Sequence, residues 1–261
     1  MRKRIVALAA LLVLTGCGSD DPVKPAPVPP SPQGGGVSGS VTVLAAASLT
    51  ESFTRIGKDF EAANPGAKVS FSFGGSSGLA TQITSGAPAD VFASASPATM
   101  TTVIDAGDGA SAPATFVKNQ LVIAVPKGNP KGVSSLAALA RPDLKVALCA
   151  GQVPCGAAAK KALAAANVKV TPVTQEQDVR AALAKVKLGE VDAALVYRTD
   201  ARAAAADVDG VEFPESAKAI NDYPIVALKN AANPAAAAVF VAYVQSEPAQ
   251  KVLADAGFQK P

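Results

Sequence analysis

The sequence contains no histidine and no tryptophan among its 261 residues, and only three tyrosines and three cysteines. Without histidine, Ser-His-Asp and Cys-His catalysis and most zinc sites are excluded, because all of them use imidazole as a base or a ligand. Sugar-binding sites usually stack the sugar on aromatic rings, and this chain has few of them. The composition therefore argues against several large classes of enzyme and against a sugar carrier.

The formal net charge of +3 comes entirely from Arg2, Lys3 and Arg4, which precede an apolar run near the start of the chain. From Cys17 onward the basic and acidic residues balance. A neutral protein has little electrostatic attraction for a polyanion, so we expect no nucleic-acid partner.

The apolar run spans Ile5 to Leu14, which is shorter than the roughly 18 to 20 residues of a membrane-spanning helix. It predicts a signal peptide over residues 1–16. The letters LTGC, which end at Cys17, resemble the lipobox of bacterial lipoproteins. The sequence thus predicts a lipid on Cys17 that anchors the protein to the outer face of the cell membrane. Ordinary secretion with a chance cysteine is the alternative.

Residues 17–40 are rich in proline and then in glycine and contain almost nothing apolar to bury. This composition predicts a tether that is semi-rigid in its first half and flexible in its second half. The part from Val41 to Pro261 is long enough for one large domain or two lobes. No second linker of this composition follows, so two lobes would have to be tightly connected.

Beyond the tether, short apolar runs alternate with helical patterns, which indicates an α/β architecture with largely parallel sheets. Proline after Ser96 and after Asn233 predicts helix starts there, and Gly257 predicts a helix end. The predicted strands are Val41–Ala47, Val69–Phe73, Asp90–Ser94, Leu121–Pro126, Lys145–Leu148, Val168–Val173, Ala193–Tyr197 and Pro224–Leu228.

Four predicted junctions between a strand and a helix carry small or polar residues. Ser48 follows the first strand and Glu51 lies three residues on, the spacing of a capping box. The segment GGSSG at 74–78 is neither a P-loop nor a dinucleotide-binding loop, and alone it is only a weak signal for anion binding. In the second half, one helix begins near Pro154 and another at Asp178 and Val179. A helix start supplies free amides and partial positive charge, so these junctions favour a negative ligand.

Several stretches together resemble the molybdate-binding proteins of bacterial ABC importers: AAASLTESF, SFGGSSGLATQITSGAPADVFASA, VPCGAAAKKAL, QDVRAALAKVKLGEVDAALVYRTDA and NDYPIVAL. The resemblance covers nearly all of residues 41–261. It implies an α/β type II periplasmic-binding-protein fold, with two α/β lobes joined by crossing strands and a ligand cleft between them. The lobes would comprise residues 41–121 plus 224–261 and residues 122–223. It also implies a monomer that delivers molybdate or tungstate to a membrane permease, without a cofactor and without catalysis.

The same resemblance implies a set of residues that bind the oxyanion, and a metal only as part of that oxyanion. These are Ser48 and Ser76 through hydroxyl and amide, Cys155 and Val179 through their amides, and Tyr197 through its phenol. Many relatives have alanine where this chain has Cys155, a change that keeps the amide donor. None of the five is lysine or arginine, so neutral donors and helix dipoles would bind the anion. The residues alone favour the alternative that Tyr197 is a core tyrosine with a locally bonded hydroxyl.

Other functions remain as alternatives. An enzyme would use Ser76 or Ser77 as its nucleophile, but no histidine base and no S-x-x-K motif accompany them. A sulfate or phosphate carrier is the strongest competitor, because the same donors suit any tetrahedral oxyanion. Phosphate would need an acceptor for its proton, and Asp178 is the only carboxylate within the site motifs. Arg180 and Arg198 adjoin two of the sites, and we interpret them as ion-pair residues.

Cys149 and Cys155 flank the short segment AGQVP. Export places both thiols in an oxidising compartment, and the lipid occupies Cys17, so the remaining two make an even pair. We expect a disulfide between them, with two reduced and buried thiols as the alternative.

Overall fold

The computed structural model of the protein describes residues 36–261. The predicted signal peptide, the predicted lipidation site Cys17 and most of the predicted tether lie outside the described residues. Among the helices of residues 36–261, none combines the length and the apolar character needed to cross a bilayer.

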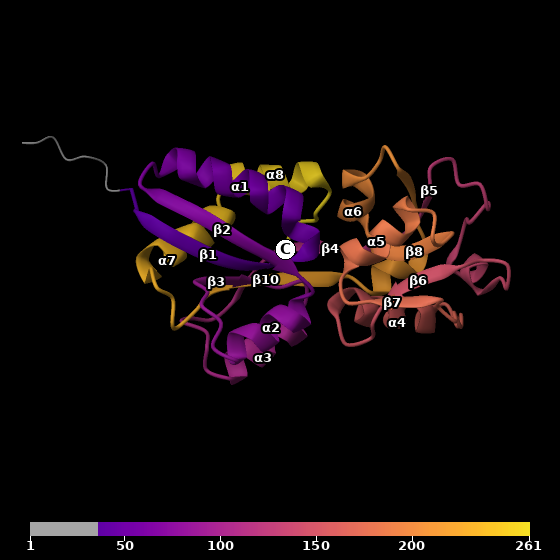
Figure 1. The fold of residues 1–261 in the computed structure, drawn as a ribbon, viewed down its shortest axis with the longest axis horizontal. Coiled ribbons are helices and arrows are strands. Elements are labelled where there is room, and N and C mark those ends of the chain that lie inside the picture. The colour runs from indigo at the N-terminus through magenta and orange to yellow at the C-terminus, as the bar shows by residue number, and fades with distance from the viewer. Residues whose placement is uncertain (1–35) are drawn as a thin grey trace, which may run out of the picture. The chain divides into compact units, whose positions relative to one another are not determined.

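Ten strands form two five-stranded sheets, one in each lobe (Figure 1). The first sheet has the order β2-β1-β3-β10-β4. Its central strand β1 is parallel to β2 and β3, whereas β10 is antiparallel to β3 and β4. The strand bounds are β1 Gly39–Ala46, β2 Ala67–Gly74, β3 Val91–Ala93, β4 Ala114–Asn119 and β10 Asn221–Ala227.

Helices cover both faces of the first sheet. Helices α1 (Thr50–Ala63), α7 (Pro234–Val244) and α8 (Glu247–Ala256) pack on one face, and α2 (Ser76–Thr84) and α3 (Pro97–Asp105) pack on the other (Figure 1). Aromatic rings fill the first interface: Phe60 meets Phe240 edge-on with ring centroids 5.2 Å apart. The inner strands β1 and β3 are buried on both faces and read as the apolar runs VLAA and VFA, whereas the edge strand β2 alternates polar and apolar residues.

The second sheet has the order β7-β6-β8-β5-β9. Helix α4 (Pro154–Ala165) packs on one face, and α5 (Val179–Lys187) and α6 (Arg198–Ala203) pack on the other. The strand bounds are β5 Leu121–Pro126, β6 Val146–Cys149, β7 Thr174–Glu176, β8 Ala193–Tyr197 and β9 Val208–Val211. Residues 36–261 also contain three short 3-10 helices: η1 Ala47–Leu49, η2 Leu136–Ala140 and η3 Pro214–Lys218.

The chain passes between the two sheets twice. Gln120 alone links β4 of the first sheet to β5 of the second, and the return runs from η3 into β10. The strands therefore change sheet after Asn119 and before Asn221. The lobe boundaries of the sequence analysis, 41–121 plus 224–261 and 122–223, fall within three residues of these changes of sheet and stay a proposal.

Three local predictions are confirmed. The Ser96 side chain accepts a hydrogen bond from the Thr99 amide at the start of α3, and Asn233 caps α7 in the same way. Gly257 ends α8 with a φ of 104°, in the left-handed region that glycine adopts without steric cost.

The predicted strand Val168–Val173 is wrong. This segment contains Pro172, which has no N–H group for a ladder, and its residues are alternately exposed and half-buried without regular pairing. Pairing with β6 begins only at Thr174. Strands β4 and β9 were not predicted, because their short sequences, ATFVKN and VDGV, lack a long apolar run. Gly39 and Ser40, assigned to the tether, belong to β1, because backbone pairing needs no apolar side chain.

Candidate ligand-binding cleft

The five residues that the sequence analysis singled out line one cleft between the lobes. Its enclosed volume is about 10 Å³, roughly the space of one water molecule, so only a small ion suits it. All five residues are buried. The lining consists of Ala46, Ala47, Ser48, Gly74, Gly75, Ser76, Ala95, Val153, Pro154, Cys155, Asp178, Val179 and Tyr197, without a lysine or an arginine.

Two serines come from the first lobe. Ser48 lies in η1, directly after β1, and its Oγ is 2.8 Å from the hydroxyl of Tyr223. Ser76 is the first residue of α2, and its Oγ accepts a 3.0 Å hydrogen bond from the amide of Ala95. The capping box predicted for Ser48 and Glu51 is wrong, since Ser48 makes no cap hydrogen bond and α1 begins at Thr50. A 3-10 turn inserted before α1 accounts for the shift.

Two helix starts come from the second lobe. Cys155 is the second residue of α4, and Val179 is the first residue of α5. A first-turn amide has no acceptor within its own helix, so both can donate to a ligand in the cleft. The carboxylate of Asp178 caps α5 by accepting a 2.9 Å hydrogen bond from the Ala181 amide. The Oδ1 atom of Asp178 therefore accepts a hydrogen bond from the first turn of α5.

Tyr197 is the last residue of β8, and it is both a core residue and a residue of the cleft. It is 1% exposed, as a core residue is, and it also lines the cleft. The side-chain amide of Asn221 donates a 2.9 Å hydrogen bond to its hydroxyl. Burial raises the pKa of Tyr197 well above its usual value, so the phenol keeps its proton and can donate it.

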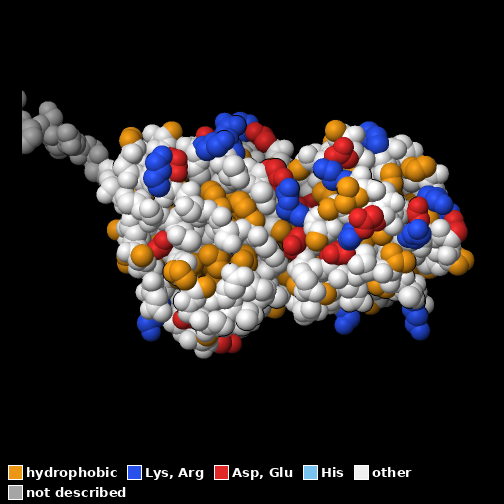
Figure 2. Space-filling model, viewed as in Figure 1, with side chains coloured by type: hydrophobic (Ala, Val, Ile, Leu, Met, Phe, Trp, Pro, Cys, Tyr) orange, Lys and Arg blue, Asp and Glu red, His pale blue; other side chains and the backbone are white. Residues whose placement is uncertain are grey.

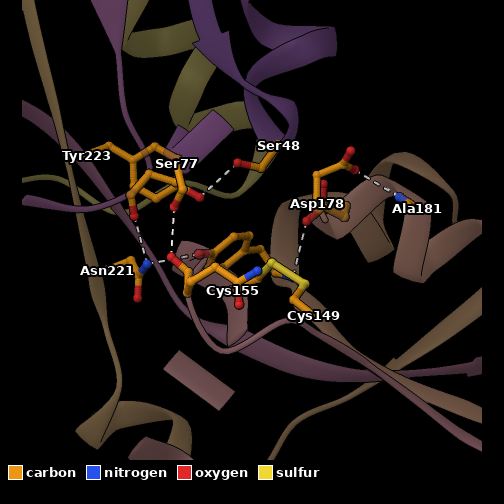
Figure 3. The surroundings of a disulfide bond; sticks show 12 residues. Ser48, Ser77, Cys149, Cys155, Asp178, Ala181, Asn221 and Tyr223 are labelled. Atoms are coloured by element: carbon orange, nitrogen blue, oxygen red, sulfur yellow. Dashed lines mark hydrogen bonds between the residues drawn. A yellow bond between two sulfur atoms is a disulfide. The ribbon is translucent and has the colours of Figure 1, made fainter. Parts of the chain in front are cut away.

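A disulfide joins Cys149, the last residue of β6, to Cys155 in the first turn of α4, with their Cα atoms 5.8 Å apart (Figure 3). The bridge ties the start of the helix to the end of the strand. The loop inside it is tight, because a Cβ at Gly156 would lie 1.9 Å from the carbonyl oxygen of Ala150. The amide of Cys155 is thus held in place by both a covalent link and close packing.

The lobes touch each other around the cleft. Ser77 Oγ donates a 2.7 Å hydrogen bond to the Gln152 carbonyl. A Cβ at Gly75 would lie 2.2 Å from the carbonyl oxygen of Gln177, so only glycine allows this approach. Arg180 of α5 pairs with Glu51 of α1.

Charged side chains of both signs are interspersed on the face seen in Figure 2, including the junction of the lobes. Arg198 pairs with Glu212 at 2.7 Å within the second lobe, while Arg180 bridges the two lobes. The interpretation of both arginines as ion-pair residues is therefore confirmed.

The serines are not arranged for nucleophilic catalysis. Ser76 Oγ accepts from an amide and Ser77 Oγ donates to a carbonyl, so neither hydroxyl faces a base in these contacts. Within residues 36–261, no three His, Cys, Asp or Glu side chains gather as ligands for a metal cation. The cleft offers hydrogen-bond donors rather than reactive groups.

Comparisons with known proteins agree with this geometry. A family model described as bacterial extracellular solute-binding protein matches residues 41–259. The chain is 45% identical over 256 residues to the molybdate-binding protein ModA of Mycobacterium tuberculosis, covering 97% of this chain and 96% of the relative. It superposes on the periplasmic molybdate-binding protein of Azotobacter vinelandii with a TM-score of 0.71 at 20% identity, over 85% of this chain and 99% of that one.

The sulfate-binding protein SubI of Mycobacterium tuberculosis has a TM-score of 0.74 at 21% identity, over 85% of this chain and 86% of that one. At such identities the two structures show the fold alone. The sequence relative and the family model show more: the chain belongs to the bacterial extracellular solute-binding proteins, within the ModA family of molybdate-binding proteins. The resemblance and the fold class predicted from the sequence are confirmed. Members of this family are transport proteins and not enzymes.

Three buried polar residues near the cleft were not singled out from the sequence. Asn221 and Tyr223 contact the hydroxyls of Tyr197 and Ser48. Asp200 accepts a 3.1 Å hydrogen bond from the Tyr197 amide at the start of α6. Alternation in NDYPIVAL places Asn221 and Tyr223 on one strand face, but no sequence signal indicates what that face contacts.

Burial raises the pKa of the Asp200 carboxyl to about 8, against the opposing hydrogen bond from Tyr197 and with a further contribution from Glu51. The carboxyl of Asp200 is therefore mostly protonated at neutral pH. A neutral carboxyl would not repel an anion bound in the cleft.

Asp200 should make the folded protein less stable as pH rises from about 4 to about 8. Below this window the carboxyl is protonated in both states. Within it the unfolded chain ionises Asp200 while the folded protein keeps the proton, which favours unfolding until pH passes about 8. Urea unfolding across the window should show a flatter pH dependence for Asp200→Asn than for the parent. The exposed Asp105→Asn is the control, and equal slopes for the parent and Asp200→Asn would contradict the prediction.

Proposed function

We propose that this protein captures molybdate, and tungstate equally, through Ser48, Ser76, Cys155, Val179 and Tyr197, and delivers it to an ABC importer. The observation that carries the proposal is the meeting of these five donor-bearing residues, two from one lobe and three from the other, at one small cleft. The 45% identical relative is named a molybdate-binding protein, which supports the choice of anion.

The donor set suits a fully ionised tetrahedral oxyanion. Amides at the starts of α2, α4 and α5 combine their hydrogen bonds with the positive ends of the helix dipoles. Hydrogen bonds to a charged group contribute roughly 1.5–3 kcal/mol each, so five or more of them can replace the water around a dianion. With no cation lining the cleft, the anion is bound by neutral groups and can be released to the importer.

Closure of the lobes around the anion follows from the origin of the donors. An anion that bonds to both lobes has higher affinity for the closed form, which is the condition for a ligand to shift the population. The direct contacts between the lobes at Gly75 and Ser77 support this proposal. We propose that the membrane permease recognises this shape.

The remaining parts of the proposal concern location. The lipobox-like sequence at Cys17 and the proline- and glycine-rich segment after it support a lipid anchor with a tether, on the outer face of the cell membrane. We further propose that the protein acts as a monomer.

Sulfate is the second candidate ligand, because its tetrahedral oxygens would use the same donors. Sulfate is smaller, so some donors would be left too far away, and buried unpaired amides are costly. Calorimetric titration of the ligand-free protein should therefore show nearly equal affinity for molybdate and tungstate and at least about 10-fold weaker binding of sulfate. Sulfate binding as tight as molybdate binding would instead assign the protein to sulfate.

Tyr197→Phe should weaken molybdate binding by about 10- to 100-fold, because it removes one hydrogen bond to the anion. The matched control is Tyr243→Phe on α7, whose hydroxyl is away from the cleft. Titration calorimetry measures both variants, with thermal unfolding as a check on folding. Unchanged affinity in a folded Tyr197→Phe variant would remove the phenol from the site.

Gly75→Ala should prevent full closure, because its new methyl group would overlap the Gln177 carbonyl. Gly78→Ala, three residues further on in α2, is the control, since a Cβ there has no neighbour within 4 Å. With saturating molybdate, small-angle scattering should show a contraction for the parent and Gly78→Ala, and a smaller one for Gly75→Ala. The same contraction in all three proteins would contradict the closure argument.

A further inference from the structure

Two side chains of β10 contact hydroxyl groups of the proposed site. Asn221 and Tyr223 are two residues apart in this strand, so their side chains leave it on the same face. One contacts Tyr197 of the second lobe and the other contacts Ser48 of the first. Figure 3 shows Asn221, Tyr223 and Ser48 together near the disulfide of Cys155. The strand that returns the chain to the first sheet thus contacts a hydroxyl of each lobe.

The hydrogen bonds of Asn221 have a fixed direction. Its Nδ2 donates 2.7 Å to the carbonyl of Ala95 and 2.9 Å to the hydroxyl of Tyr197. A carbonyl only accepts, so the atom that faces Ala95 must be the amide nitrogen and not the amide oxygen. The hydroxyl oxygen of Tyr197 therefore accepts, and its own proton remains for another acceptor.

Ala95 extends the same arrangement to Ser76. Its carbonyl accepts from Asn221, and its amide donates to Ser76 Oγ at 3.0 Å. An amide only donates, so Ser76 Oγ accepts and keeps its own proton for the cleft. Asn221 consequently acts on one hydroxyl directly and on a second through the Ala95 backbone.

Tyr223 has the corresponding role toward Ser48. Either hydroxyl of this pair can donate in the 2.8 Å bond between them. Burial raises the pKa of Tyr223 well above its usual value, so its hydroxyl stays protonated. With an anion in the cleft, Ser48 donates to the anion and Tyr223 donates to Ser48, because a hydrogen bond to a charged acceptor is about twice as strong as one between neutral groups.

We propose that Asn221 and Tyr223 are positioning residues, which direct the hydroxyl protons of Tyr197, Ser76 and Ser48 toward the bound anion. The inference rests on the proposed function, since it concerns the binding of an anion by these hydroxyls. Neither residue lines the cleft itself, so each acts through a neighbour.

The tyrosines provide a matched comparison. Sodium molybdate is titrated into the full chain and its variants by calorimetry. Tyr223→Phe should weaken binding about 3- to 10-fold, the value of one neutral hydrogen bond, while Tyr243→Phe stays within about twofold of the parent. In a Ser48→Ala background, Tyr223→Phe should have no further effect. An equal loss in both backgrounds would show that Tyr223 does not act through Ser48.

Asn221→Leu keeps the size of the side chain and removes both donors. It should weaken molybdate binding about 10- to 100-fold, as loss of such supporting hydrogen bonds does at metal sites. In a Tyr197→Phe background the loss should be at least about threefold smaller, because one of its two targets is gone. Equal losses overturn the role toward Tyr197. If Asn221→Leu does not fold, Asn221→Ala is used for the same comparison.

A spectroscopic measurement separates positioning from general destabilisation. The chain has three tyrosines and no tryptophan, so its near-ultraviolet absorption reports on tyrosine hydroxyls. Molybdate should produce a difference spectrum in the parent and in Tyr243→Phe, a much smaller one from Tyr223 in Tyr197→Phe, and a diminished one in Asn221→Leu at saturation. An undiminished spectrum in Asn221→Leu contradicts the inference. A parent that binds no molybdate rejects the proposed function itself, whereas a parent that binds with variants of unchanged affinity rejects only the positioning roles.

Discussion

An amide in the first turn of a helix has no acceptor within that helix, and three such turns meet at the cleft. Helix α2 follows β2, α4 follows β6 and α5 follows β7, each after a short connection. The parallel pairing of β1 with β2 and of β6 with β7 therefore determines where the amides of these first turns point. The tight loop at Gly156 and the disulfide of Cys155 maintain one of them. The remaining features of the cleft depend on this convergence.

No positively charged side chain of residues 36–261 lines the cleft. The arginines beside it, Arg180 and Arg198, are engaged with glutamates. Burial keeps Asp200 protonated near neutral pH, which avoids a second negative charge behind Tyr197. Helix dipoles and hydroxyl donors therefore meet an anion in surroundings close to neutral.

The sequence was informative where one local pattern determines the structure. The caps at Ser96, Asn233 and Gly257 and most strands follow from short stretches, and the ordered motifs identified the family. It failed where tertiary contacts decide. Ser48 bonds to Tyr223, 175 positions away, instead of capping α1, and Val168–Val173 is too interrupted by Pro172 to pair. The contacts of Asn221 likewise depend on two lobes meeting, which no local pattern encodes.

The contacts between the lobes at Ser77, Gly75 and the Arg180–Glu51 pair involve no ligand atom. If the lobes close as proposed, part of the free energy of closure is independent of cargo, and a fraction of empty molecules would adopt the closed shape. A transporter that recognises only this shape would bind them and complete a cycle without cargo. The strength of these few contacts would then set the rate of turnover without cargo, a quantity separate from the affinity for the anion.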